Sequence, residues 1–131
     1  MGDNKDLIKK SVDLALDFLK DISTVRVLDI IIDIYNDVRY CRMDEKTVRQ
    51  RFLKILYNLK NSETFDSLLE EGDRKALKSF LGDLLQIKYE SNKYYIGNEE
   101  FKELSLEDFY CFLIELKYRK EEAIKDKEAA T

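Results

Sequence analysis

The sequence contains no histidine, proline or tryptophan, and only four glycines and two cysteines occur among its 131 residues. Without histidine, the chain cannot build the Ser–His or Cys–His pairs of nucleophilic catalysis, nor a histidine metal site. The four glycines form neither a Walker phosphate-binding loop nor a G-x-G-x-x-G pattern. We therefore expect a protein that is not an enzyme, with no catalytic residue, no cofactor and no small-molecule substrate.

The other scarcities limit fold and location. Because proline and glycine are the usual helix breakers, their shortage favours long helices. Cys41 and Cys111 are too few for a disulfide framework, and Cys111, within FYCFL, is interpreted as a small core residue. No apolar run approaches the roughly 18 residues of a membrane span. The first ten residues, MGDNKDLIKK, lack the pattern of a signal peptide, so we expect an intracellular protein.

Apolar residues form 44% of the chain and charged residues 38%, which suits a packed core beneath a highly charged surface. The apolar positions recur with the 3.6-residue period of helices. The resulting helices are predicted at 4–22, 25–41, 45–61, 62 to about 72, 73–86 and 106 to about 126. We therefore expect one domain, residues 1–131, folded as a mainly α, compact bundle of five to six helices. The charged tail at about 120–131 is expected to fray.

Local signals refine this prediction. Between 87 and 96 the period changes to alternation around Ser91-Asn92, which indicates a β-hairpin. The sequence SLED at 105–108 is a capping box that begins the last helix. The other predicted helix caps are Ser23 or Thr24, Asp44 and Asp73.

Three aspartates, Asp29, Asp33 and Asp37, recur every fourth residue within the otherwise apolar stretch RVLDIIIDIYNDVRY. Such a stripe could hold a hard cation, which prefers oxygen ligands. One helix rarely completes a metal coordination shell, however, and no Glu-x-x-His companion exists. We therefore interpret the stripe as the hydrated or ion-paired edge of a buried helix, with Arg26 as a local partner and no metal.

Positive charge is concentrated in one part of the chain. Residues 38–60 contain seven basic and two acidic residues, a net charge of +5. The rest contains 16 basic and 25 acidic residues, a net charge of −9 within an overall −4. A basic helix could bind nucleic acid. It could also dock on the acidic first helices of its own chain or of a neighbour, and we favour this protein-binding interpretation.

Residues 47–97 resemble a winged helix-turn-helix: a helix, then SETFDSLLEE, a turn at Gly72-Asp73, the helix RKALKSFLGDLLQ and the hairpin IKYESNKYYIG as the wing. In that family the second helix of the pair enters the major groove of DNA. The resemblance implies nucleic-acid contacts from that helix and from the wing, at Lys75, Lys78, Ser79, Gln86, Lys88 and Lys93. The segment departs from the family in lacking arginine and asparagine at base-reading positions and a strand between the first two helices.

The last predicted helix has two apolar stripes. One, which contains Phe109 and Phe112, is predicted to face the core, and the other contains Tyr110, Ile114 and Tyr118. Such a helix is either fully enclosed or shared with a partner. Because tyrosine buries its ring while its hydroxyl stays hydrated, we select Tyr110, Ile114 and Tyr118 as the candidate protein interface.

The composition as a whole is similar to that of small orphan proteins of crenarchaeal viruses, namely virion structural proteins of the Acidianus two-tailed virus type. The similarity lies in the length, in the abundance of Lys, Glu, Ile and Tyr, and in the absence of His, Trp and Pro. It implies a thermophilic viral protein of the virion, present in the host cytoplasm during assembly. Its expected partners are other copies of itself and other virion proteins, with winged-helix DNA binding as the alternative.

Overall fold

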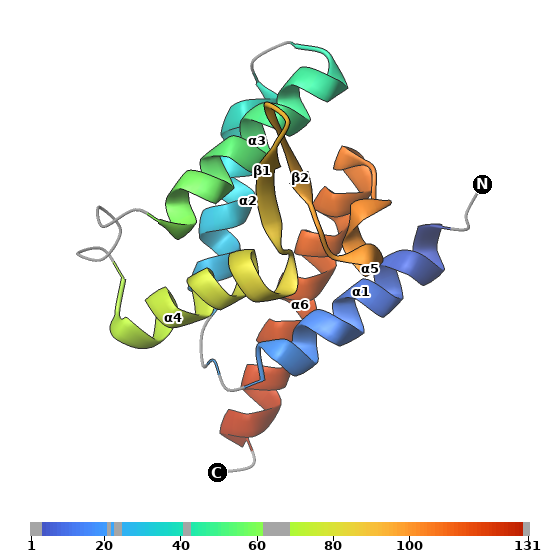
Figure 1. Ribbon diagram of the computed structural model, residues 1–131. Coiled ribbons are helices and arrows are strands. Elements are labelled where there is room, and N and C mark those ends of the chain that lie inside the picture. The colour runs from blue at the N-terminus through green and yellow to red at the C-terminus, as the bar shows by residue number, and fades with distance from the viewer. Residues whose placement is uncertain (1–3, 21, 23–24, 41–42, 62–68, 130–131) are drawn as a thin grey trace.

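The computed structural model describes residues 4–20, 22, 25–40, 43–61 and 69–129 (Figure 1). Across these residues it is a mainly α-helical, compact domain with six helices and one antiparallel hairpin, which confirms the predicted fold class. Its elements are α1 (Asn4–Phe18), α2 (Arg26–Arg39), α3 (Glu45–Lys60), α4 (Glu71–Ser79), the π-helical turn η2 (Phe80–Leu84), β1 (Ile87–Glu90), β2 (Lys93–Ile96), α5 (Glu99–Lys102) and α6 (Leu106–Ala129).

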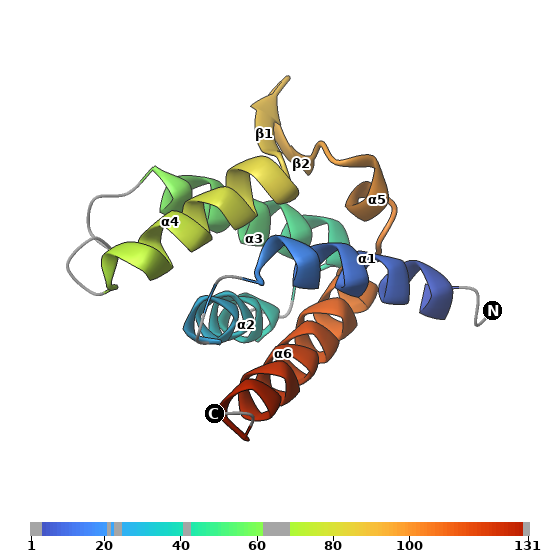
Figure 2. The same ribbon diagram turned by 90° about the horizontal axis from the view of Figure 1, so that it is seen from below.

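The helices pack in crossed layers. Helices α2 and α3 lie side by side, α6 packs against α2, and α1 crosses α6 (Figures 1 and 2). The hairpin packs on α3. In Figure 2 the hairpin projects from the top of the molecule while α6 runs along the bottom, so these two elements lie on opposite sides of the domain. None of the described helices is both long and apolar enough to span a membrane.

A chain of touching aromatic rings joins four helices through the core. Tyr35 of α2 meets Phe52 of α3 edge-on, with 5.6 Å between ring centroids, and Phe52 contacts Phe109 of α6 at 5.9 Å. From Phe109 the contacts continue through Phe112 to Phe101 of α5. Each such ring buries a large apolar area and prefers these tilted or edge-on geometries. The short helix α5, which the sequence did not predict, is thereby anchored to α6.

The beginning of α3 organises the beginning of α6. The Glu45 carboxylate accepts a hydrogen bond from the Leu106 N–H at 3.3 Å, and the Arg49 guanidinium donates to the Leu104 carbonyl at 3.0 Å. Burial lowers the pKa of Arg49, and the nearby Glu45 opposes that shift. Arg49, a member of the basic segment 38–60, therefore binds a backbone group of its own chain.

Two predicted caps are confirmed. Asp44 accepts from the Thr47 N–H at 2.7 Å at the beginning of α3, and Ser105 accepts from the Asp108 N–H at 3.1 Å at the beginning of α6. These bonds satisfy N–H groups that have no partner within a helix. Ser23 and Thr24 lie outside the described residues, and Val25 precedes α2 without a side-chain cap.

The prediction for the region around Gly72 was wrong. Asp73 does not cap a helix, because α4 begins at Glu71 after Glu70 in extended conformation, so Gly72-Asp73 lies within its first turn. Of the helix predicted from residue 62, residues 62–68 lie outside the described residues. The helix also changes character at Phe80, where the Leu85 N–H binds the Phe80 carbonyl five residues back. Three apolar side chains of this turn, Phe80, Leu81 and Leu84, are buried, and so is Leu85, which follows it.

The predicted hairpin is confirmed, with Ile87 opposite Ile96 and Glu90 opposite Lys93. Ser91 and Asn92 form its turn with φ of 54° and 65°. Two positive φ values in a two-residue turn match the right-handed twist of the strands, and Asn tolerates this conformation better than most residues. Gly97, which follows β2, is constrained because a Cβ there would lie 3.0 Å from the Gln86 carbonyl oxygen.

Candidate functional site

The candidate interface on α6 is divided by the structure. Tyr110 is half-buried, and its ring stacks on Tyr35 of α2 with 4.5 Å between centroids and 19° between planes. Ile114 and Tyr118 are solvent-exposed, at 41% and 59%. Cys111 is also exposed, so its interpretation as a core residue was wrong. Tyr110 thus contributes to packing between α2 and α6, while Ile114, Tyr118 and Cys111 form an outer strip, here called the α6 strip.

Charged pairs flank the α6 strip. Lys117 of α6 binds Asp29 of α2 with 2.6 Å between Nζ and Oδ1, and Arg119 pairs with Glu115 at 3.4 Å. The hydrogen bond to Asp29 raises the pKa of Lys117, and burial opposes that rise. The strip is therefore an apolar area with an ion-paired margin, which is the usual composition of a protein interface.

The ion pair with Lys117 supplies a partner for one member of the acidic stripe on α2. Asp33 is exposed, and Asp37 takes part in a further interaction. No three His, Cys, Asp or Glu side chains within the described ranges are grouped so as to hold a metal ion. Asp29 and Asp33 instead line a shallow acidic groove of about 660 Å³ with Glu70 and Asp73, and Arg26 lies at its side.

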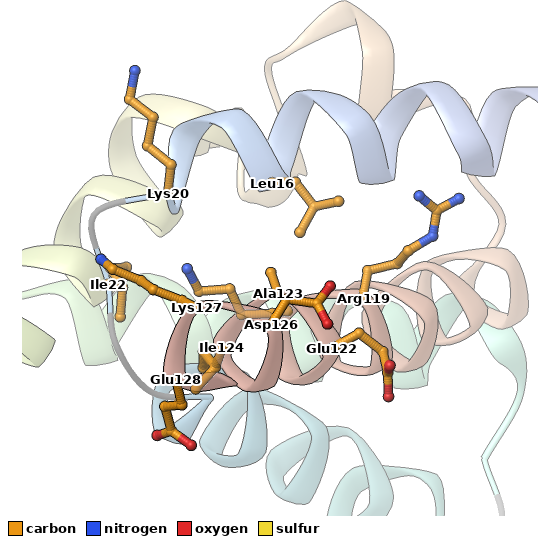
Figure 3. Close-up of a pocket in the computed structure, with 11 residues that line it drawn as sticks. Leu16, Lys20, Ile22, Arg119, Glu122, Ala123, Ile124, Asp126, Lys127 and Glu128 are labelled. Carbon is orange, nitrogen blue, oxygen red and sulfur yellow. The ribbon is translucent and has the colours of Figure 1, made fainter. Parts of the chain in front are cut away.

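A second groove, of about 680 Å³, lies between the end of α1 and the last turns of α6 (Figure 3). Leu16 points from α1 toward Ala123 of α6. Lys120 also lines this groove; it is only 5% exposed, and its ammonium donates a hydrogen bond to the Leu19 carbonyl at 2.8 Å. A cation at the C-terminal end of a helix interacts favourably with its dipole. Lys120 therefore joins α6 to the end of α1, a role that sequence analysis missed although the residue interrupts the apolar stripe of Leu113 and Leu116.

The winged-helix candidates lie on two elements. Lys75 and Lys78 project from α4, where Lys75 pairs with Glu71 at 3.5 Å, and Ser79 is half-buried at its end. Gln86 lies before β1 with a φ of 53°. Lys88 and Lys93 are exposed on the hairpin. The six candidates are thus at or near the surface, but they do not form one basic stripe along α4.

The hairpin is attached to α3 along its open edge. The Gln50 side-chain amide donates to the Tyr94 carbonyl at 2.7 Å and accepts from the Tyr94 N–H at 2.8 Å, which replaces the pairing that a third strand would supply. Tyr94 then contacts Tyr57 of α3 and Tyr89 of β1, with centroids 5.5 Å and 4.6 Å apart. The Lys60 ammonium lies 5.3 Å from the centroid of the Tyr57 ring. Sequence analysis missed this row of tyrosines because its members come from separate elements.

A groove of about 590 Å³ adjoins this row, between α3, β2 and α5. Its lining includes Arg49, Lys93 and Lys102 against one acid, Glu103, together with Tyr94 and Tyr95. Basic groups and tyrosines therefore occur together on this side of the domain. Comparisons with protein-family models, with curated proteins and with solved structures gave no match.

Proposed function

We propose that the protein is a non-enzymatic structural protein that self-associates through the α6 strip. The observation that supports this proposal is the exposure of Ile114 and Tyr118 side by side on a helix whose opposite face already fills the core. Soluble monomers tend to avoid contiguous apolar patches. A second copy that presents the same strip is the simplest cover, because a two-fold axis lets one patch meet itself.

The arrangement suits a two-fold axis near Ile114. Ile114 would lie at the centre, with Cys111 of one copy toward Tyr118 of the other. The charged margin also suits association, because Glu115 and Arg119 carry opposite signs and could exchange partners between copies. Such an interface adds protein contacts without any catalytic group, which agrees with the role of a particle component.

The virion assignment within this proposal rests on composition. The Lys-, Glu-, Ile- and Tyr-rich chain without His, Trp or Pro resembles the virion structural proteins of crenarchaeal viruses. In such a particle, self-association and contacts with other virion proteins are the required activities, and assembly in the host cytoplasm supplies the location.

The test is the mass in solution, measured by light scattering. We expect a dimer or larger species, which Ile114→Asp shifts toward 15.6 kDa while the helical circular dichroism is unchanged. Ile55→Asp is the matched control, because Ile55 has similar exposure on α3, and it should leave the mass unchanged. Phe18→Asp tests the other exposed apolar pair, Leu14 and Phe18 of α1. A monomeric parent, or a loss of mass on Phe18→Asp alone, contradicts the assignment to α6.

A further inference from the structure

From Lys46 onward, every charged residue of α3 is basic. Residues 46–61 contain five basic residues and no acidic one, in a protein whose net charge is −4. Arg51 and Lys54 are exposed on α3, as are Lys88 and Lys93 on the hairpin beside it. Within the described residues these four side chains take part in no ion pair. Their charge is therefore available to an external anion.

Aromatic rings lie on both sides of the hairpin. Tyr89 and Tyr94 are on the side that packs on α3, and Lys88, Lys93 and Tyr95 are on the other side, together with Glu90. Tyr89 is 50% exposed, and it continues the row of contacting rings that runs from Tyr57 through Tyr94. On the other side of the hairpin, Tyr95 of β2 is exposed, and its hydroxyl donates a hydrogen bond to the carboxylate of Glu90 on β1. Gln50 fixes the hairpin to α3, so the rings have a rigid support.

We propose that α3 and the hairpin form a binding surface for single-stranded nucleic acid. The proposed surface, here called the basic–aromatic face, extends around the hairpin. It comprises Arg51, Lys54, Tyr57 and Lys60 of α3, Tyr89 and Tyr94 on the side of the hairpin toward α3, and Lys88, Lys93 and Tyr95 on its other side. The lysines and Arg51 bind phosphates, and Tyr89 and Tyr95 stack on unpaired bases. Proteins that hold single strands without sequence preference combine the same two elements, a positively charged groove and aromatic platforms.

The tyrosines favour a single strand over other polyanions. A duplex hides the faces of its bases, so exposed rings add little to its binding, whereas unpaired bases stack on aromatic side chains. The acidic groove of a second copy, around Asp29 and Asp33, would match the charge but offers no aromatic partner for Tyr89. The hairpin lies on the opposite side of the domain from α6 (Figure 2), so we expect nucleic-acid binding to be separate from association through the α6 strip.

The experiment measures fluorescence anisotropy of labelled oligothymidylate and oligouridylate of about 20 nucleotides, with a duplex of equal length for comparison. At low salt, about 50 mM, we expect the full chain to bind both single strands more tightly than the duplex. Lys54→Glu with Lys93→Glu should weaken binding at least about tenfold and flatten its salt dependence. Tyr89→Ala should weaken binding about tenfold and leave the salt dependence unchanged, because it removes stacking and no charge.

Matched control variants distinguish the effect of changing this face from the effect of changing the net charge of the protein. Lys9→Glu with Lys125→Glu makes the same change of charge on α1 and α6, and Tyr40→Ala removes an exposed ring at the end of α2. Both variants should stay within about twofold of the parent. Lys75→Glu with Lys78→Glu reports on α4. Circular dichroism confirms that each variant is folded.

Several results would overturn the proposal. These are absence of binding to both single strands, equal weakening by the Lys9/Lys125 control, and tighter binding of the duplex that depends on Lys75 and Lys78. In a further case, the parent fails to bind nucleic acid while the Lys54/Lys93 variant has a lower mass in solution than the parent. That result would mean that the basic–aromatic face binds the acidic groove of a second copy. Binding that survives Ile114→Asp supports a surface independent of α6.

Discussion

The side chain of Gln50 completes the edge of the hairpin by binding both polar groups of the Tyr94 backbone, at 2.7 and 2.8 Å. Forty-four residues separate the two positions. An open strand edge presents unpaired N–H and carbonyl groups that invite aggregation. Here one amide side chain satisfies the middle of that edge and also fixes the tyrosine row against α3.

Gln50→Ala should therefore lower the free energy of unfolding by about 1–3 kcal/mol, because two part-buried backbone groups lose their partner. Gln50→Glu keeps an acceptor for the Tyr94 N–H but loses the donor to the Tyr94 carbonyl. This variant therefore retains one of the two hydrogen bonds. Urea denaturation gives the energies, and hydrogen exchange at the Tyr94 amide reports the local effect. Unchanged exchange in the alanine variant would show that the bond contributes nothing.

Lys120→Met should destabilise the protein by about 1–3 kcal/mol, because the Leu19 carbonyl loses its charged donor at the end of α1. Methionine keeps the apolar stem, so the change isolates the ammonium. Lys20→Met, which changes the exposed lysine next to Leu19, is the control. It should change stability by less than about 0.5 kcal/mol. Thermal unfolding measures both. A more stable Lys120→Met variant would mean that desolvation of the ammonium outweighs its hydrogen bond.

The cap that Asp44 forms at the beginning of α3 should make the stability of the protein depend on pH. Its hydrogen bonds from Thr47 lower its pKa below the ordinary 3.8. A lowered pKa in the folded state gives stability that is fully present above pH 3.8 and is lost as the pH falls through the folded-state pKa. The parent should therefore exceed Asp44→Ala in stability at neutral pH, and the difference should shrink below pH 3.8. Urea denaturation across this range tests the sign, and a difference that grows in acid would contradict it.

Local chemistry made part of this fold predictable. The alternation around Ser91-Asn92 and the caps at Asp44 and Ser105 are signals within a few residues, and the structure confirms each one. The turn predicted at Gly72-Asp73 was wrong because a lone glycine can also lie in the first turn of a helix. The π-helical turn was missed because pairs of adjacent apolar residues, such as Phe80-Leu81, also fit an ordinary buried helix.

The candidate sites depended more on contacts that no local pattern reveals. The period of α6 correctly separated its outer stripe from its core stripe, but it could not show that Tyr35 covers Tyr110. The structure pairs Asp29 with Lys117 of α6, a helix far from Asp29 in the sequence, and no local pattern around Asp29 predicted this ion pair. The tyrosine row required the register of the hairpin and its docking on α3, which only the folded chain provides.

The acidic stripe of α2 should respond unequally to neutralisation. Asp29→Asn removes the ion pair with Lys117 and should cost about 0.2–1 kcal/mol, the range of exposed pairs. Asp33→Asn should change stability little or raise it slightly, because it relieves repulsion between carboxylates four residues apart. Thermal unfolding of the two variants in low and high salt distinguishes these effects. Stabilisation of the parent, but not of Asp33→Asn, by calcium or manganese would instead revive a cation site.

Cross-linking at Cys111 tests the two-fold axis of the proposed interface. If the axis passes near Ile114, antiparallel α6 helices place the two Cys111 residues six residues of helical rise apart, about 9 Å along the helix. Adding a typical distance between helices gives a separation of about 12 Å. That exceeds the roughly 7 Å between Cα atoms that a disulfide allows. In a Cys41→Ser background, a flexible bismaleimide should therefore trap the dimer, whereas mild oxidation should not.

Denaturing electrophoresis reads out the cross-linked product. Ile114→Asp is the control for specificity, because it should abolish the product while leaving the thiol accessible to a monofunctional maleimide. Rapid disulfide formation would move the axis to Cys111 itself, with the two thiols face to face. Failure of the bismaleimide to join an oligomeric parent would place the interface on another surface, and the exposed pair Leu14 and Phe18 on α1 would then be the next to mutate.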